Sequence, residues 1–148
     1  MDDREIISGL IAESARQLSR EHYSGEQIEG AIASVFGVDS DLIKDGTYFV
    51  AEGWGVMLGC GGWSRRKTLF GGDQYSTRDA GYLDPKSEPA KIRAFFVHPA
   101  HARKGIARAI LALRNWGKGS RFSCARVDGN SSGDSVLPVV WFFEDWQL

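Results

Sequence analysis

The stretch "IRAFFVHPAHARKGIARAILAL", from Ile92 to Leu113, decides the fold of this chain. Its first six residues are apolar apart from Arg93, which is typical of a central strand in a sheet covered on both faces. His98-Pro99 ends that run, and a basic turn around Gly105 leads into small and aliphatic residues with helical patterning. The stretch therefore predicts a strand, a glycine-containing turn and a helix.

The N-terminal part of the chain predicts helices. Over residues 4–20 apolar side chains recur at helical spacing, with charged residues between them. Ser24 precedes Gln27 by three positions, a capping-box pattern that opens a second helix through Val35. Asp39 is placed to cap a short helical turn before the Asp45-Gly46 turn.

After this the apolar period changes to that of strands. The runs at 47–53 and 55–63 are rich in β-forming residues, are separated by Gly53-Trp54, and predict an antiparallel hairpin. Glycines at 59, 61 and 62 are costly in a strand unless another backbone or a ligand comes close. Residues 64–91 form a long polar segment, interpreted equally as a substrate-side loop or a disordered insertion. Its Arg65-Arg66-Lys67 triplet favours a solvated strand end over a phosphate site.

The composition bounds the function. A chain of 148 residues predicts one domain, here 1–148, and a net charge of −1 gives no basic field for nucleic acid or an acidic membrane. Cys60 and Cys124 lack metal-ligand spacing, so we expect reduced thiols and no metal site. The acidic start is no signal peptide, and no apolar run reaches membrane-spanning length. We therefore expect a cytoplasmic protein without a membrane partner.

The turn has the chemistry of an anion site. A helix start leaves backbone N–H groups without partners and carries a partial positive charge, so phosphates bind there. Gly105 lets the backbone approach an anion, and Arg103, Lys104 and Arg108 add positive charge. The pattern is neither a P-loop nor a dinucleotide fingerprint.

"IRAFFVHPAHARKGIARAIL" resembles the acetyl-CoA-binding motif of the GNAT superfamily of N-acetyltransferases, a strand ending near V-x-P followed by a [QR]-x-x-G-x-[GA] turn and a helix. Gly105 and Ala107 match the two small positions, whereas Ala102 stands where the family has Gln or Arg. The resemblance covers roughly residues 4–113. It implies an α/β (α+β) fold, with a mixed, mostly antiparallel central sheet flanked by helices and uncertain last strands.

The resemblance implies an acetyl-CoA-dependent N-acetyltransferase that moves an acetyl group directly to a primary amine of a small molecule or peptide. Acetyl-CoA is then the co-substrate, and the strand end polarises its thioester carbonyl. The implied cofactor-binding residues are Phe96, Val97, Arg103, Lys104, Gly105, Ile106, Ala107 and Arg108.

The proton of the amine needs an acceptor, because an alkyl amine with a pKa of about 10 is mostly protonated at neutral pH. Glu52 and His98 are candidates, each also compatible with a structural role; His22 and His101 are weaker ones. Cys60 is disfavoured as a nucleophile, because the family transfers directly. Tyr48, Phe49, Trp54 and Trp63 are candidates for the acceptor pocket or for the core.

Residues 114–148 form an atypical C-terminal segment, because Trp116, Gly117 and Gly119 break the helical pattern. We hypothesise a single-base frame change near Leu113–Arg114. Shifted codons for residues 128–142 can spell "MATLPGIPFYRSCGF", similar to the family's second motif. The tyrosine of that motif, which can protonate the departing thiolate, corresponds to Leu137, which has no proton to donate.

Two other functions stay open. One is a protein that binds acetyl-CoA but is catalytically impaired by its altered tail. The other is a structural or interaction protein whose basic turn binds nothing. An altered tail also leaves a sheet edge open to homo-oligomers.

Overall fold

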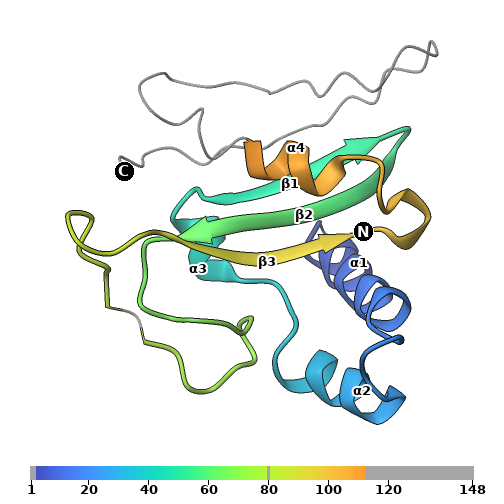
Figure 1. Ribbon diagram of the computed structural model, residues 1–148, viewed down its shortest axis with the longest axis horizontal. Coiled ribbons are helices and arrows are strands. Elements are labelled where there is room, and N and C mark those ends of the chain that lie inside the picture. Colours follow the sequence, from blue (N-terminus) through green and yellow to red (C-terminus); the bar gives the residue numbers. More distant parts are fainter. Residues whose placement is uncertain (1–2, 80, 113–148) are drawn as a thin grey trace.

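The computed structural model describes residues 3–79 and 81–112 of the chain. The interpretations of the segment 114–148, including the frame change, the place of Leu137 and the open sheet edge, lie outside the described residues. Within them the chain is a mixed α+β structure with one antiparallel sheet flanked by helices, which confirms the predicted fold class at this level (Figure 1).

The helices and strands follow the predicted order closely. The helices are α1 (Asp3–Leu18), α2 (Gly25–Ser34), α3 (Ser40–Lys44), the short 3-10 helix η1 (Pro99–His101) and α4 (Ile106–Ala112). The strands are β1 (Tyr48–Gly53), β2 (Val56–Ser64) and β3 (Lys91–Val97). The capping box is present, with the Ser24 hydroxyl accepting from Gln27 N–H and the Gln27 side chain accepting from Ser24 N–H.

The hairpin turn lies one residue later than predicted. Gly53 is the last residue of β1, and the two turn residues are Trp54 with φ 52° and Gly55 with φ 72°. Positive φ at both central residues gives the turn a twist that matches the right-handed twist of the strands. The turn residues are therefore Trp54 and Gly55, whereas the sequence predicted Gly53 and Trp54.

The sheet has the order β1-β2-β3, and both pairs are antiparallel. In the β2–β3 pair, Cys60 lies opposite Phe96 and Gly62 opposite Arg93. One residue of β2 therefore faces two of β3, which is a β-bulge, and Ala94 within it has φ 53°.

Each face of the sheet packs against helices (Figure 1). Helices α1 and α3 cover one face, where Ile7, Leu10 and Ile11 pack with Leu42, Tyr48 and Cys60. Helix α4 covers the other face, where Ile110 packs with Phe49, Leu58 and Trp63. Tyr48, Phe49 and Trp63 thus belong to the core.

The strand glycines mark close approaches, but at Gly59 and Gly61 the nearest neighbour is a side chain, whereas another backbone or a ligand was predicted. A Cβ on Gly59 would lie 2.9 Å from Cγ2 of Ile106, so α4 rests directly on this position. A Cβ on Gly61 would lie 2.6 Å from the Phe95 ring. In both cases the glycine makes room for a side chain of the protein itself.

The segment between β2 and β3 is held to the body of the protein. Its two sides pair with each other through Lys67 N–H to Gly81 C=O at 2.7 Å and Leu83 N–H to Arg65 C=O at 2.7 Å. Arg66 is 8% exposed, so the interpretation of the basic triplet as a solvated strand end is wrong at this residue. Among the described helices, none is long and apolar enough to cross a membrane.

Candidate functional site

The turn between β3 and α4 has the conformation that an anion site needs. Arg103 has φ 62° and Gly105 has φ 86°, so two residues of the turn lie in the left-handed region. Turns of this kind direct successive N–H groups towards one side, where anions bind. A Cβ on Gly105 would meet no atom of the described residues within 4 Å.

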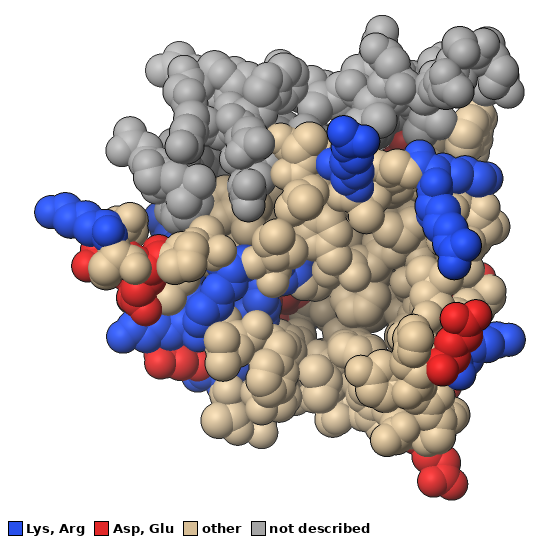
Figure 2. Space-filling model, viewed as in Figure 1, with Lys and Arg blue, Asp and Glu red and all other residues tan. Residues whose placement is uncertain are grey.

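The hydrogen-bond donors of this turn are available. No described residue accepts a hydrogen bond from the backbone N–H groups of residues 103 to 108. Gly105 C=O accepts from Ala109 N–H at 2.9 Å, so the helical ladder begins at this glycine. Arg103, Lys104 and Arg108 are exposed, and Figure 2 shows basic side chains over the turn and α4.

Val97, at the end of β3, has its backbone N–H turned away from β2. His98 N–H donates to Leu58 C=O at 2.8 Å, and neighbouring residues of an antiparallel strand point their polar groups in opposite directions. Val97 N–H instead donates to the Ser14 hydroxyl of α1 at 3.3 Å. Phe96 lies opposite Cys60, so of the two strand-end residues only Val97 directs its N–H away from the sheet.

His98 is engaged at both ring nitrogens. Nδ1 accepts from Ala100 N–H at 3.2 Å and caps η1, while Nε2 lies 3.6 Å from a carboxylate oxygen of Glu13. Because Nδ1 accepts a backbone proton, the neutral ring carries its own proton on Nε2. To act as a base, His98 would have to give up its contact with Ala100.

His101 and Trp54 join the turn to the hairpin. Their rings stack with centroids 6.0 Å apart and planes 24° from parallel. Burial lowers the pKa of His101, and the positive charges of Lys104 and His98 lower it further. Trp54 is exposed and contacts His101 of η1, so it lies outside the core.

Glu52 lies in β1 opposite Met57, beside a shift in the β1–β2 register. The next residue of β2, Leu58, accepts from His98 N–H, so Glu52 and His98 occupy the same end of the sheet. Two strand spacings place their backbones roughly 10 Å apart. Glu52 and His98 would therefore have to contact a substrate independently of each other.

A buried network of aspartates and arginines was missed by the sequence analysis. Asp39, 1% exposed, receives Arg93 at 2.7 Å and Arg78 at 2.6 Å. Arg66 makes a two-pronged pair with Asp45, both bonds being 2.7 Å. The one available signal was Arg93, a single charge in an apolar strand, because such a charge must find a buried partner.

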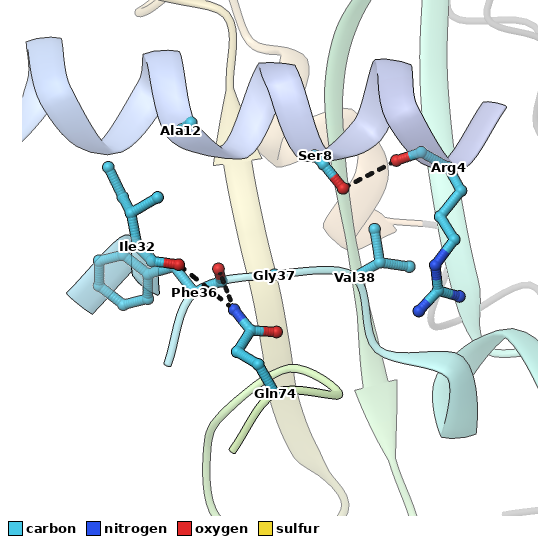
Figure 3. A pocket seen from close by; sticks show the side chains of 8 residues that line it. All are labelled: Arg4, Ser8, Ala12, Ile32, Phe36, Gly37, Val38 and Gln74. Carbon is cyan, nitrogen blue, oxygen red and sulfur yellow. Dashed lines mark hydrogen bonds between the residues drawn. The ribbon is translucent and has the colours of Figure 1, made fainter. Parts of the chain in front are cut away.

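A pocket of about 230 Å³ lies away from the basic turn, between α1 and the connection from α2 to α3 (Figure 3). Arg4, Ser8 and Ala12 line it from one side of α1, and Ile32, residues 36–38 and Gln74 complete it. The sequence analysis did not identify it, because its walls come together only when loop residue Gln74 folds back onto α2.

No protein-family model, curated protein or solved structure matches this chain.

Proposed function

We propose that this protein is an acetyl-CoA-dependent N-acetyltransferase with a GNAT-like fold, which transfers the acetyl group directly to a primary amine. The observation that carries the proposal is the β3–α4 turn, where the backbone N–H groups of residues 103–108 have no acceptor among the described residues and three exposed cations lie beside them. This combination suits the pyrophosphate of acetyl-CoA, because backbone donors and positive charge both favour a bound anion.

Arg103, Lys104 and Arg108 would supply charge to the pyrophosphate, and the backbone of residues 103–108 would supply hydrogen bonds. The left-handed φ of Gly105 supports this role, because a side chain there would strain the backbone. Acetyl-CoA brings a thioester, whose carbonyl carbon the amine attacks.

Val97 N–H is the donor at the strand end for the thioester carbonyl. Its present acceptor, the Ser14 hydroxyl, is a distant one at 3.3 Å and is replaceable by a carbonyl oxygen. A donor held in place before the reaction stabilises the negative charge that develops on that oxygen. Glu52, at the same end of the sheet, is the proposed acceptor of the amine proton, because Nδ1 of His98 already accepts from Ala100 N–H.

A second function is favoured by one observation, the pairing of the Val97 N–H with Ser14. If that hydrogen bond persists with acetyl-CoA bound, the protein binds acetyl-CoA with little or no turnover. A steady-state assay of thiol release with a panel of primary amines separates the two functions.

The first experiment is calorimetric titration of acetyl-CoA into the full chain and into Gly105→Asp. We expect saturable binding by the unmodified chain and none by the variant, since the added carboxylate repels the pyrophosphate from the turn.

Gly55→Asp is the matched control, because Gly55 also has a positive φ and a Cβ there would also meet no atom of the described residues within 4 Å. It should bind acetyl-CoA like the unmodified chain. Saturable binding by Gly105→Asp, or none by the folded unmodified chain, would exclude the turn as the cofactor site.

A further inference from the structure

Ser14 is a polar residue on the buried face of α1. The buried residues of this helix are Ile7, Leu10, Ile11, Ser14 and Ala15, and only the serine among them is polar. Its exposed fraction is 4%. A hydroxyl group in such a place costs free energy unless its proton and its oxygen both find partners.

The proton of the Ser14 hydroxyl has no acceptor among the described residues. Ser8 and Ser34 each donate to the carbonyl oxygen four positions earlier in their own helix, at 2.8 and 2.7 Å. Ser14 makes no such bond within the described part of the chain, and its oxygen only accepts from Val97 N–H at 3.3 Å. A buried donor without an acceptor is rare in native proteins and points to a partner that binds there, such as a ligand or a water molecule.

Helix α1 holds the Ser14 hydroxyl beside the end of β3 (Figure 1). The preceding residue, Glu13, has a carboxylate oxygen 3.6 Å from Nε2 of His98. Two consecutive residues of α1 therefore contact the consecutive residues Val97 and His98. The hydroxyl is thus held in place before a ligand arrives, as a group that stabilises developing charge must be.

The distance between the two groups suits a single acceptor that both can reach. Val97 N and Ser14 Oγ lie 3.3 Å apart. An oxygen about 2.9 Å from each of them would complete a triangle of nearly equal sides. A carbonyl oxygen has two lone pairs, so it can accept from the N–H and from the O–H at the same time.

We propose that the Ser14 hydroxyl is a second hydrogen-bond donor, beside Val97 N–H, to the thioester carbonyl of acetyl-CoA, an inference that rests on the proposed function. As the amine attacks the carbonyl carbon, the electron pair of the C=O bond moves to oxygen and both hydrogen bonds strengthen. When this pair re-forms the C=O bond, the C–S bond breaks and its pair leaves on the thiolate. The amine proton goes to Glu52, while Ser14 and Val97 keep their protons.

The first test is Ser14→Ala, which should keep the helix because alanine is the strongest helix former. With the best substrate from the panel of primary amines, kcat should fall about 10²–10³-fold, the effect of removing one donor to the oxyanion. The Kd of acetyl-CoA, measured by calorimetry, should stay nearly unchanged, because the carbonyl oxygen carries little charge before the reaction.

Two further variants separate the hydroxyl from the helix position. Ser14→Thr keeps a hydroxyl at this position and should retain most of the kcat. Ser34→Ala on α2 removes an exposed hydroxyl and should change neither kcat nor Kd.

A second measurement does not depend on turnover. Difference infrared spectroscopy with acetyl-CoA isotope-labelled at the carbonyl carbon reports the stretching frequency of the bound thioester carbonyl, which each donated hydrogen bond lowers. The band should lie at a lower frequency in the unmodified chain and in Ser34→Ala than in Ser14→Ala. A purely structural role of Ser14 would leave the band where it is.

An unchanged carbonyl band in Ser14→Ala would overturn the assignment of Ser14, whatever its kcat. An unchanged or higher kcat would also overturn it, and a higher one would show that Ser14 competes with the carbonyl for Val97 N–H. If the band shifts but no chain turns over any amine, Ser14 is a donor to the carbonyl and the transferase proposal alone fails. If the folded unmodified chain does not bind acetyl-CoA, both proposals fail.

Discussion

Asp39 is the residue on which three parts of the chain converge. Its Oδ1 accepts from the N–H groups of α3 at 3.1 and 3.4 Å, while Arg93 of β3 and Arg78 of the β2–β3 segment pair with its two oxygens. A buried carboxylate is tolerated here because every side of it meets a donor. One residue thus fixes a helix start, a central strand and a loop.

Asp39→Asn should lower the free energy of unfolding by about 3–5 kcal/mol, because it leaves the buried Arg93 guanidinium without its carboxylate partner, whereas Arg78 keeps Asp41 and Asp73. Urea denaturation measures the change. Glu29→Gln is the control, since it removes the partner of Arg16 in an exposed pair and should leave stability nearly unchanged. If the two variants lost similar free energy of unfolding, burial of the Asp39 ion pairs would not be the cause of their larger contribution.

Cys60 is a second buried residue with a measurable consequence. Burial raises the pKa of its thiol to about 12 from an ordinary 9.0, so the folded state holds the neutral form. This contribution to stability is fully present below about pH 9, where the unfolded thiol is also neutral. It is lost as the pH rises towards 12, because only the unfolded chain then ionises.

Between pH 8 and pH 10 the unmodified chain should therefore lose about 1 kcal/mol more stability than Cys60→Ala. Urea denaturation at the two pH values gives the comparison. Burial is also the largest cause of the raised pKa of Tyr48 and acts in both proteins, although contact with Cys60 raises that pKa further in the unmodified chain. Equal pH slopes would show that the Cys60 thiol is not held neutral by the fold.

At the scale of elements, α4 depends on the glycine beneath it. Gly59 of β2 leaves space for Ile106 and Ile110, and a Cβ there would lie 2.9 and 3.4 Å from atoms of these side chains. The carbonyl oxygen of Phe96 would lie 3.1 Å away on the same side. Because α4 packs closely on β2 at Gly59, this contact fixes the position of the turn that precedes α4. The proposed cofactor site lies in that turn.

Gly59→Ala should destabilise the protein by about 1–3 kcal/mol, because the added methyl group overpacks the contact with α4. Gly30→Ala in α2 should have the opposite sign and stabilise by about 0.5–1 kcal/mol, since its Cβ would meet no atom within 4 Å. Thermal and urea unfolding test both signs. A neutral Gly59→Ala would mean that α4 shifts freely over the sheet.

At the scale of the whole molecule, the β2–β3 segment is joined to the body through charge. Arg66, Arg78 and Arg93 reach aspartates that lie 21 to 54 positions away in the sequence. Figure 2 shows basic and acidic side chains together beside this segment. The Arg93 guanidinium also donates to Thr68 C=O and Gly71 C=O, at 2.9 and 2.8 Å.

Native protein should therefore resist tryptic cleavage after Arg66, and Asp45→Asn should expose that bond, because Arg66 loses its carboxylate partner. Limited proteolysis with mass spectrometry follows each cleavage site separately. Cleavage after the exposed Arg20 serves as the internal reference. Rapid cleavage after Arg66 in the unmodified chain would contradict the burial of this side chain.

The frame change stays a prediction about residues 114–148. The coding DNA tests it directly, since its third bases must spell "MATLPGIPFYRSCGF" when residues 128–142 are read in the shifted frame. Restoring that frame should then return a tyrosine at the position of Leu137 and raise turnover without changing acetyl-CoA affinity.

The sequence by itself determined the kinds of element and their order. Apolar periods, the Ser24 capping box, the cap at Asp39 and the Asp45-Gly46 turn are local signals whose partners lie a few residues away. The basic turn was predictable for the same reason, because the charges of Arg103 and Lys104 and the backbone freedom of Gly105 are properties of consecutive residues.

Only the tertiary structure decided which charges are buried and where the pocket beside α1 lies. No local pattern pairs Arg93 with Asp39 or folds Gln74 back onto Phe36, because these partners are 54 and 38 positions apart. The same holds for Val97 N–H, whose acceptor on Ser14 is 83 positions away. Such contacts depend on how the helices pack on the sheet, and the packing is a property of the whole chain.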